Sequence, residues 1–103
     1  MQKLVKDFND KKKCHKTPMP AYARLMDITS ESGKLSREYL RATKYGTKEL
    51  KTTSKLKMEY GGLLYSVLSL GNEMGLKADT CLNMALKEYQ ERMDKNETMS
   101  SEK

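Results

Sequence analysis

Residues 58–75 read MEYGGLLYSVLSLGNEMG, and this stretch decides the fold of the chain. Large apolar residues recur here at alternating steps of four and three, which places them on one stripe of an α-helix. The stripe consists of Leu56, Tyr60, Leu63, Val67, Leu70 and Met74. Gly75 follows, and glycine readily adopts the left-handed conformation that ends a helix. We expect a buried helix that is capped by Thr53 or Ser54 and runs to Met74.

A second amphipathic helix is expected from about Ala21 to Thr43. Its apolar stripe has the same period and consists of Leu25, Ile28, Leu35 and Tyr39, with Ser32 at the stripe position between Ile28 and Leu35. In both helices, polar residues lie one position before stripe residues; they are Asp27, Glu31, Lys34, Glu38 and Glu59. If the two helices pack antiparallel, Glu31 and Lys34 face Glu59 and Gly62. The pattern therefore predicts a site made of these four positions.

The rest of the chain completes an all-α fold. We expect a single domain over residues 1–93, with a short N-terminal helix at 2–13, a core at 21–93 and a polar, disordered tail at 94–103. The core includes a fourth helix at about 78–93, and no strand pattern is seen. Because only 37% of the 103 residues are hydrophobic, we expect the helical bundle to be completed by oligomerisation.

The net charge of +6 is concentrated in one region. Residues 34–57 contain eight lysines and arginines but only two acidic residues, which gives this segment a net charge of +6. Such a patch attracts polyanions, including nucleotides and nucleic acid. A solvated, solubilising face is the alternative interpretation of the same lysines.

The sequence indicates a cytoplasmic protein. It contains no apolar run of the roughly 18 residues that a membrane span needs. The N-terminal segment MQKLVKDFNDKKK also lacks the continuous apolar region of a signal peptide. Cys14 and Cys81 are the only cysteines, and we expect both to be free thiols, with Cys81 as a small core residue.

Three motifs in series resemble those of the MazG-type nucleoside triphosphate pyrophosphohydrolases. Residues 30–38, SESGKLSRE, look like the first metal motif of that family, and residues 59–65, EYGGLLY, look like the second. Residues 75–79, GLKAD, followed by residues 85–92, ALKEYQER, resemble the last helix. The likeness covers about Ala21 to Met93, in the order that the family has.

The resemblance implies a four-helix MazG-like bundle that forms a homodimer or a dimer of dimers. It also implies cleavage of a nucleoside triphosphate to a monophosphate and pyrophosphate, with Mg²⁺ held by Glu-x-x-Glu on one helix and Glu-x-x-Asp on the next. Glu31 and Glu59 match the first carboxylate of each pair, and on this basis they are the candidate catalytic residues. Lys34 and Gly62 stand where the second carboxylates are expected, so a charge of −4 at the four positions becomes −1.

Three functions follow as hypotheses. The first is a degenerate active site that binds a nucleotide or phosphate compound without efficient hydrolysis, with phosphate contacts from Lys34, Lys55, Lys87 and Arg92. The second is an active pyrophosphohydrolase with rearranged Mg²⁺ ligands, namely Glu31, Glu59, Glu38 and Asp27, although Glu38 is also placed to pair with Lys34. The third is a helical interaction or nucleic-acid-binding protein that reuses the fold. Glu31 and Glu59 are otherwise solvated residues at the edges of their helices.

Overall fold

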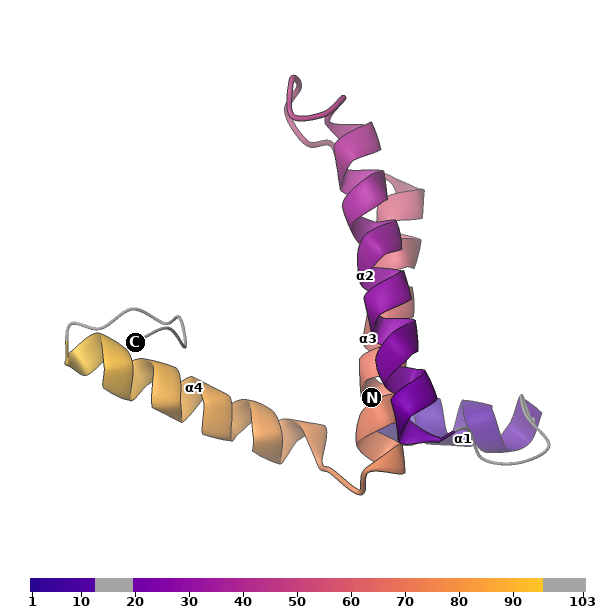
Figure 1. Ribbon diagram of the computed structural model, residues 1–103, viewed down its shortest axis with the longest axis vertical. Helices are drawn as coiled ribbons and strands as arrows, with labels where there is room; N and C mark the ends of the chain where they lie inside the picture. Colours follow the sequence, from indigo (N-terminus) through magenta and orange to yellow (C-terminus); the bar gives the residue numbers. More distant parts are fainter. Residues whose placement is uncertain (13–19, 96–103) are drawn as a thin grey trace.

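The computed structural model describes residues 1–12 and 20–95, and it is all-helical within those ranges. Its helices are α1 (Gln2–Lys12), α2 (Ala21–Ala42), α3 (Ser54–Glu73) and α4 (Ala78–Asp94), as Figure 1 shows. The expected all-α class is therefore confirmed. Lys13, where the first helix was expected to end, lies outside the described residues, as do Cys14 and most of the expected tail.

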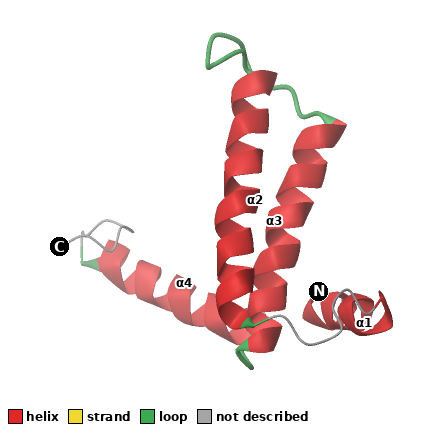
Figure 2. Ribbon diagram, turned by 45° about the vertical axis from the view of Figure 1, so that its right-hand side comes forward, coloured by secondary structure: helices red, strands yellow, loops and turns green. Residues whose placement is uncertain are grey.

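Helices α2 and α3 form an antiparallel hairpin that is the body of the molecule (Figure 2). Thr53 caps α3, since its side-chain oxygen accepts a hydrogen bond of 3.0 Å from the backbone N–H of Leu56. Gly75 follows the other end of α3 with a φ of 70°, in the left-handed region expected of it. Local sequence signals thus determine both ends of the central helix.

The turn that joins α2 to α3 is built on Thr43. Its buried hydroxyl donates to the carbonyl of Tyr39 at 2.9 Å and accepts from the backbone N–H of Gly46 at 3.1 Å. Lys44 and Tyr45 both have positive φ, at 48° and 59°, which reverses the chain immediately after the helix. We call this end of the hairpin, residues 43–53, its tip.

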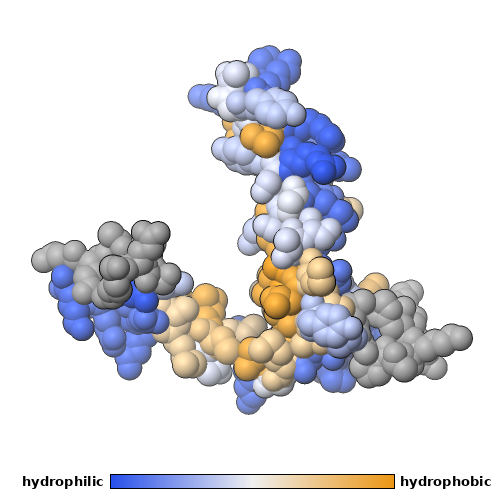
Figure 3. All heavy atoms as spheres, viewed as in Figure 1, coloured by the Kyte–Doolittle hydropathy of each residue, from blue (hydrophilic) through white to orange (hydrophobic). Residues whose placement is uncertain are grey.

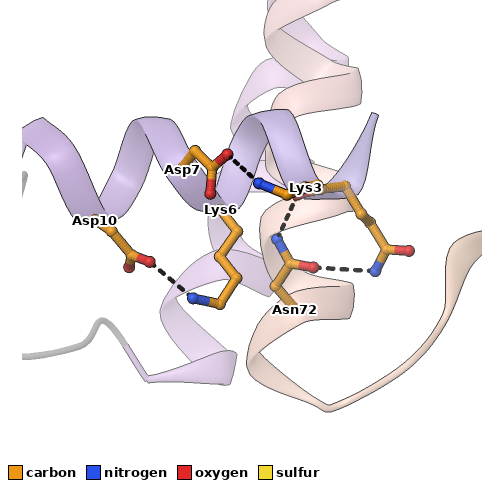
Figure 4. A network of polar contacts seen from close by, with 6 residues as sticks. Lys3, Lys6, Asp7, Asp10 and Asn72 are labelled. Carbon is orange, nitrogen blue, oxygen red and sulfur yellow. Dashed lines mark hydrogen bonds and ion pairs between the residues drawn. The ribbon is translucent and has the colours of Figure 1, made fainter.

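Helix α1 crosses the end of the hairpin that is opposite the tip. Asn72 on α3 accepts a hydrogen bond of 3.1 Å from the Gln2 side chain and donates one of 3.2 Å to the Gln2 carbonyl. Figure 4 shows Asn72 beside the first turn of α1, where Lys3–Asp7 and Lys6–Asp10 ion pairs run along the exposed side of the helix. The Gln2 side chain also accepts from the N–H of Ala78, so it links α1 to the start of α4.

Helix α4 projects away from the hairpin and makes little contact with the other helices (Figures 1 and 2). The radius of gyration is 16.7 Å, whereas a compact domain of this length has about 13 Å. Cys81 on α4 is exposed, so the expectation of a core residue there is wrong. The reason is that no part of the described chain packs over its helix.

The apolar stripe of α3 is largely uncovered within the chain. Tyr60 is 62% exposed, and Val67 and Met74 are also exposed, whereas the buried residues of α3 are Ser66, Leu68 and Ser69. One chain therefore leaves much of this stripe exposed, although α3 contains more buried residues than α2 or α4. Figure 3 shows hydrophobic residues on the surface of the hairpin and along the first part of α4. None of the described helices combines the length and apolar character of a membrane span.

Candidate functional site

A charged cavity of about 320 Å³ lies between α2 and α3, close to the tip. Its lining from α2 is Lys34, Arg37, Glu38 and Arg41, and its lining from α3 is Lys55 and Glu59. Arg37 and Glu38 follow Lys34 by three and four positions, and Arg41 follows Arg37 by four, so the α2 residues share one face of the helix. We refer to this feature as the charged cavity. Its four cationic and two acidic side chains give the lining a net charge of +2.

The antiparallel register places Glu31 against Gly62, one turn from the charged cavity. A Cβ atom at Gly62 would lie 2.9 Å from the Oε2 atom of Glu31. Lys34 and Glu59 meet in the lining of the charged cavity itself. The structure therefore brings together the four positions that the helical pattern predicted to face each other. They are Glu31, Lys34, Glu59 and Gly62.

The ion pairs around the charged cavity differ from the expected one. Lys34 pairs with Glu31, with 3.3 Å between Nζ and Oε1, and Arg41 pairs with Glu38, with 3.5 Å between Nη1 and Oε1. The expected Lys34–Glu38 pair is thus replaced by two pairs at spacing three. Glu38 is only 7% exposed, because it lies between the two helices. Its carboxylate is held by a neighbour on its own helix.

Two of the cations in the charged cavity are not used by the fold. Within residues 1–12 and 20–95, Arg37 and Lys55 make no ion pair and no side-chain hydrogen bond, and both are exposed. The charges of Arg37 and Lys55 therefore remain available to a ligand. The neighbouring Lys34 and Arg41 lie 3.3 Å and 3.5 Å from their acidic partners. The arrangement is that of a small anion site with partial internal neutralisation.

The residues present do not fit the Mg²⁺ site that the MazG resemblance implies. Among the described residues, no three His, Cys, Asp or Glu side chains gather into a group that could hold a metal ion. Glu31 is in contact with the Lys34 ammonium group, and Gly62 supplies no side chain. Glu59 and Glu38 line the charged cavity together with four cations. Mg²⁺ prefers a near-octahedral set of oxygen ligands. The Lys34 ammonium group, 3.3 Å from the Glu31 carboxylate, would repel a Mg²⁺ ion bound there.

The four expected phosphate contacts are divided between two places. Lys34 and Lys55 line the charged cavity, whereas Lys87 and Arg92 lie on α4, which leaves the opposite end of the hairpin (Figure 1) and contributes no residue to the lining. Arg92 pairs with Glu88 on the same helix. Arg37 and Arg41 were not among the expected phosphate contacts, although both line the charged cavity. Their spacing from Lys34, at three and seven positions, was the signal that would have identified them.

A second feature of the hairpin is an apolar groove of about 720 Å³. Its main apolar walls are Leu35 and Tyr39 from α2 and Leu56 and Tyr60 from α3, all of them residues of the two apolar stripes. Ser36, Leu40, Thr52 and Lys57 complete the lining. We refer to it as the apolar groove. The hairpin therefore presents one charged and one apolar concave surface near the same end.

Comparisons of the chain with protein-family models, with curated proteins and with solved structures gave no match. The two concave surfaces of the hairpin, together with the three motifs that resemble MazG-type proteins, are the features on which a function can be built.

Proposed function

We propose that this chain is a MazG-like helical protein that binds a nucleotide or another phosphate compound in the charged cavity and hydrolyses it weakly or not at all. The observation that supports this most strongly is the set of four cations, Lys34, Arg37, Arg41 and Lys55, around a cavity of about 320 Å³. Cavities of roughly 300–1,000 Å³ are typical of small-molecule sites. Arg37 and Lys55 have no acidic partner among the described residues, which leaves them for the ligand.

Each cation has a distinct part in this proposal. Lys34 supplies a fixed positive charge at a position where MazG-type proteins are expected to use a carboxylate and Mg²⁺. Arg37 and Arg41 present planar guanidinium groups that can bind two phosphate oxygens at once, and Lys55 provides a point charge from the facing helix. Direct contact between cation and phosphate then requires no bridging metal ion.

The same substitutions disfavour hydrolysis. In the second hypothesis, Glu31 and Glu59 are catalytic and Glu38 is a further metal ligand. Here Glu31 is occupied by Lys34, and Glu38 is held by Arg41. An ammonium group binds phosphate but does not generate a hydroxide nucleophile as a metal ion does. Binding without turnover suits a sensor, a sequestering protein or a regulatory subunit in the cytoplasm.

We propose that the working unit is a homodimer or a dimer of dimers. The chain has an accessible surface of 8564 Å², whereas a compact protein of this mass exposes about 5,900 Å². Only Val5 and Leu68 are buried hydrophobic residues among those described. Burial of the exposed stripes between copies supplies the core that one chain lacks, and this completes a helical bundle.

The proposal predicts that Lys34→Ala weakens binding of a nucleoside triphosphate by about tenfold or more, since a hydrogen bond between charged groups contributes roughly 1.5–3 kcal/mol. Lys77→Ala is the matched control, because it removes an exposed lysine outside the charged cavity. Titration calorimetry measures both variants, and a pyrophosphate-release assay is run alongside. Equal loss of affinity in the two variants contradicts a role for the charged cavity.

Pyrophosphate release and binding to nucleic acid distinguish the other two hypotheses from this one. Rapid Mg²⁺-dependent release of pyrophosphate, lost in Glu31→Ala and Glu59→Ala, would show an active enzyme with rearranged ligands. Binding to long RNA or DNA that is tighter than binding to mononucleotides, and that falls steeply with salt, would indicate a nucleic-acid-binding protein. Either result replaces the function proposed here.

A further inference from the structure

Helix α4 has an apolar stripe that nothing in the described chain covers. The stripe consists of Ala78, Cys81, Leu82, Ala85, Tyr89 and Met93. Leu82 is 57% exposed, and Tyr89 and Met93 are exposed as well. A free amphipathic helix of 17 residues, about 25 Å long, is not stable by its own propensity and requires a surface to pack against.

The charges of α4 indicate which surface that is. Residues 78–94 contain four acidic and two basic residues, a net charge of −2. Residues 34–57, which hold all of the groove lining except Tyr60, have a net charge of +6, and the charge is still +2 when the four cations of the charged cavity are left out. The apolar groove is open, is formed by two helices, and has Lys57 in its lining. An acidic amphipathic helix is thus complementary to it in both charge and apolar character.

The position of α4 favours a groove on another molecule. It leaves the hairpin at the end opposite the tip and projects to the side (Figures 1 and 2), and no α4 residue lines the apolar groove of its own chain. A second hairpin placed tip against tip would instead bring two segments of charge +6 together. The surface in excess of a compact protein, about 2,700 Å² per chain, exceeds the roughly 800 Å² per partner of a standard interface.

We propose that α4 of one chain docks in the apolar groove of a second copy of the chain, and that the exchange is reciprocal. Leu82, Tyr89 and Met93 then pack against Leu35, Tyr39, Leu56 and Tyr60 of the other copy. This inference rests on the homodimer proposed above but not on what the charged cavity binds, because the two concave surfaces have different linings.

Single substitutions test each half of the contact by sedimentation velocity. The wild type is expected to have a mass at least twice the 11.8 kDa of one chain. Leu82→Glu on α4 and Tyr60→Glu in the groove should each weaken the dimer by about tenfold or more, since an unpaired charge is buried in an apolar contact. Both residues are exposed in one chain, so the fold of the monomer is retained. The controls are Asn83→Glu and Met58→Glu, which put the same charge on exposed positions outside the apolar stripes of the same helices.

Mixing the two damaged variants then tests reciprocity. Leu82→Glu keeps an intact groove and Tyr60→Glu keeps an intact α4, so the mixed pair has one complete contact while each variant alone has none. We expect a heterodimer at concentrations where neither variant dimerises. The proposal is overturned if Leu82→Glu dimerises as well as Asn83→Glu. It is also overturned if mixing the two variants restores no dimer. That result would indicate that α4 packs on its own chain, or that the hairpins associate without α4.

Discussion

Replacing Lys34 by glutamate together with Gly62 by aspartate is expected to tighten Mg²⁺ binding by about a hundredfold or more. The change converts a charge of −1 at the four facing positions into −4 and supplies the oxygen ligands that a hard divalent cation prefers. In the unmodified chain, the Lys34 ammonium group lies 3.3 Å from Glu31 and opposes any metal ion there. Titration calorimetry with Mg²⁺ compares the two proteins directly.

The geometry explains why both substitutions are needed. A Cβ at position 62 meets the Glu31 carboxylate at 2.9 Å, so Gly62→Asp alone crowds a group that Lys34 still holds. Lys34→Glu releases Glu31, whose flexible end then moves aside. Adding Glu31→Ala should abolish the gain. The matched control is Lys51→Glu with Gly61→Asp, which makes the same charge change where a Cβ meets nothing. Tight Mg²⁺ binding by the wild type that is lost in Glu31→Ala would contradict our account of the site.

Removing the two unpaired cations of the charged cavity should have an effect of similar size. Arg37→Ala with Lys55→Ala is expected to weaken triphosphate binding by about a hundredfold, as two charge-assisted contacts are lost. Arg37 and Lys55 are exposed and take part in no ion pair among the described residues, so the helices should pack as before. Circular dichroism checks the fold, and titration calorimetry measures the affinity.

A second double variant shows whether the cavity or the overall charge is responsible. Lys48→Ala with Lys51→Ala removes the same charge from the exposed tip, outside the charged cavity. We expect its affinity to stay within about threefold of wild type, because exposed charges beyond roughly 8 Å are screened at physiological salt. An equal loss in both double variants would indicate diffuse attraction of polyanions by the basic segment.

The sequence was sufficient to locate the helices. Thr53 and Gly75 are local signals, and a side-chain cap and a left-handed glycine act in the same way whatever the rest of the chain does. The facing of Glu31 and Gly62 was also predictable, because it follows from helical period and antiparallel packing alone. Local chemistry and periodicity therefore account for the hairpin and for the position of the charged cavity.

The burial pattern was not predictable from periodicity. A stripe such as the one through Tyr60 and Val67 shows that a helix has an apolar side, but it does not show whether the same chain covers that side. Arg24 illustrates the converse, since it is only 5% exposed and its guanidinium lies 5.7 Å from the centre of the Tyr65 ring. A long side chain can bury its stem and stack on an aromatic ring, which a hydrophobic pattern does not reveal. The sequence also does not show where α4 lies relative to the hairpin. Lys87 and Arg92 were therefore expected to contact phosphate, although they lie outside the charged cavity.

The most direct test of the central claim is the binding of a nucleoside triphosphate in the presence of excess EDTA. A site that uses Lys34, Arg37, Arg41 and Lys55 in place of a metal ion should keep its affinity within about threefold when divalent cations are removed, since its contacts are direct charge-assisted hydrogen bonds. Titration calorimetry with and without EDTA provides the comparison. Retained binding is the result that we predict. Binding that disappears in EDTA and returns with Mg²⁺ would contradict the account, because it would show that a metal ion still bridges protein and phosphate.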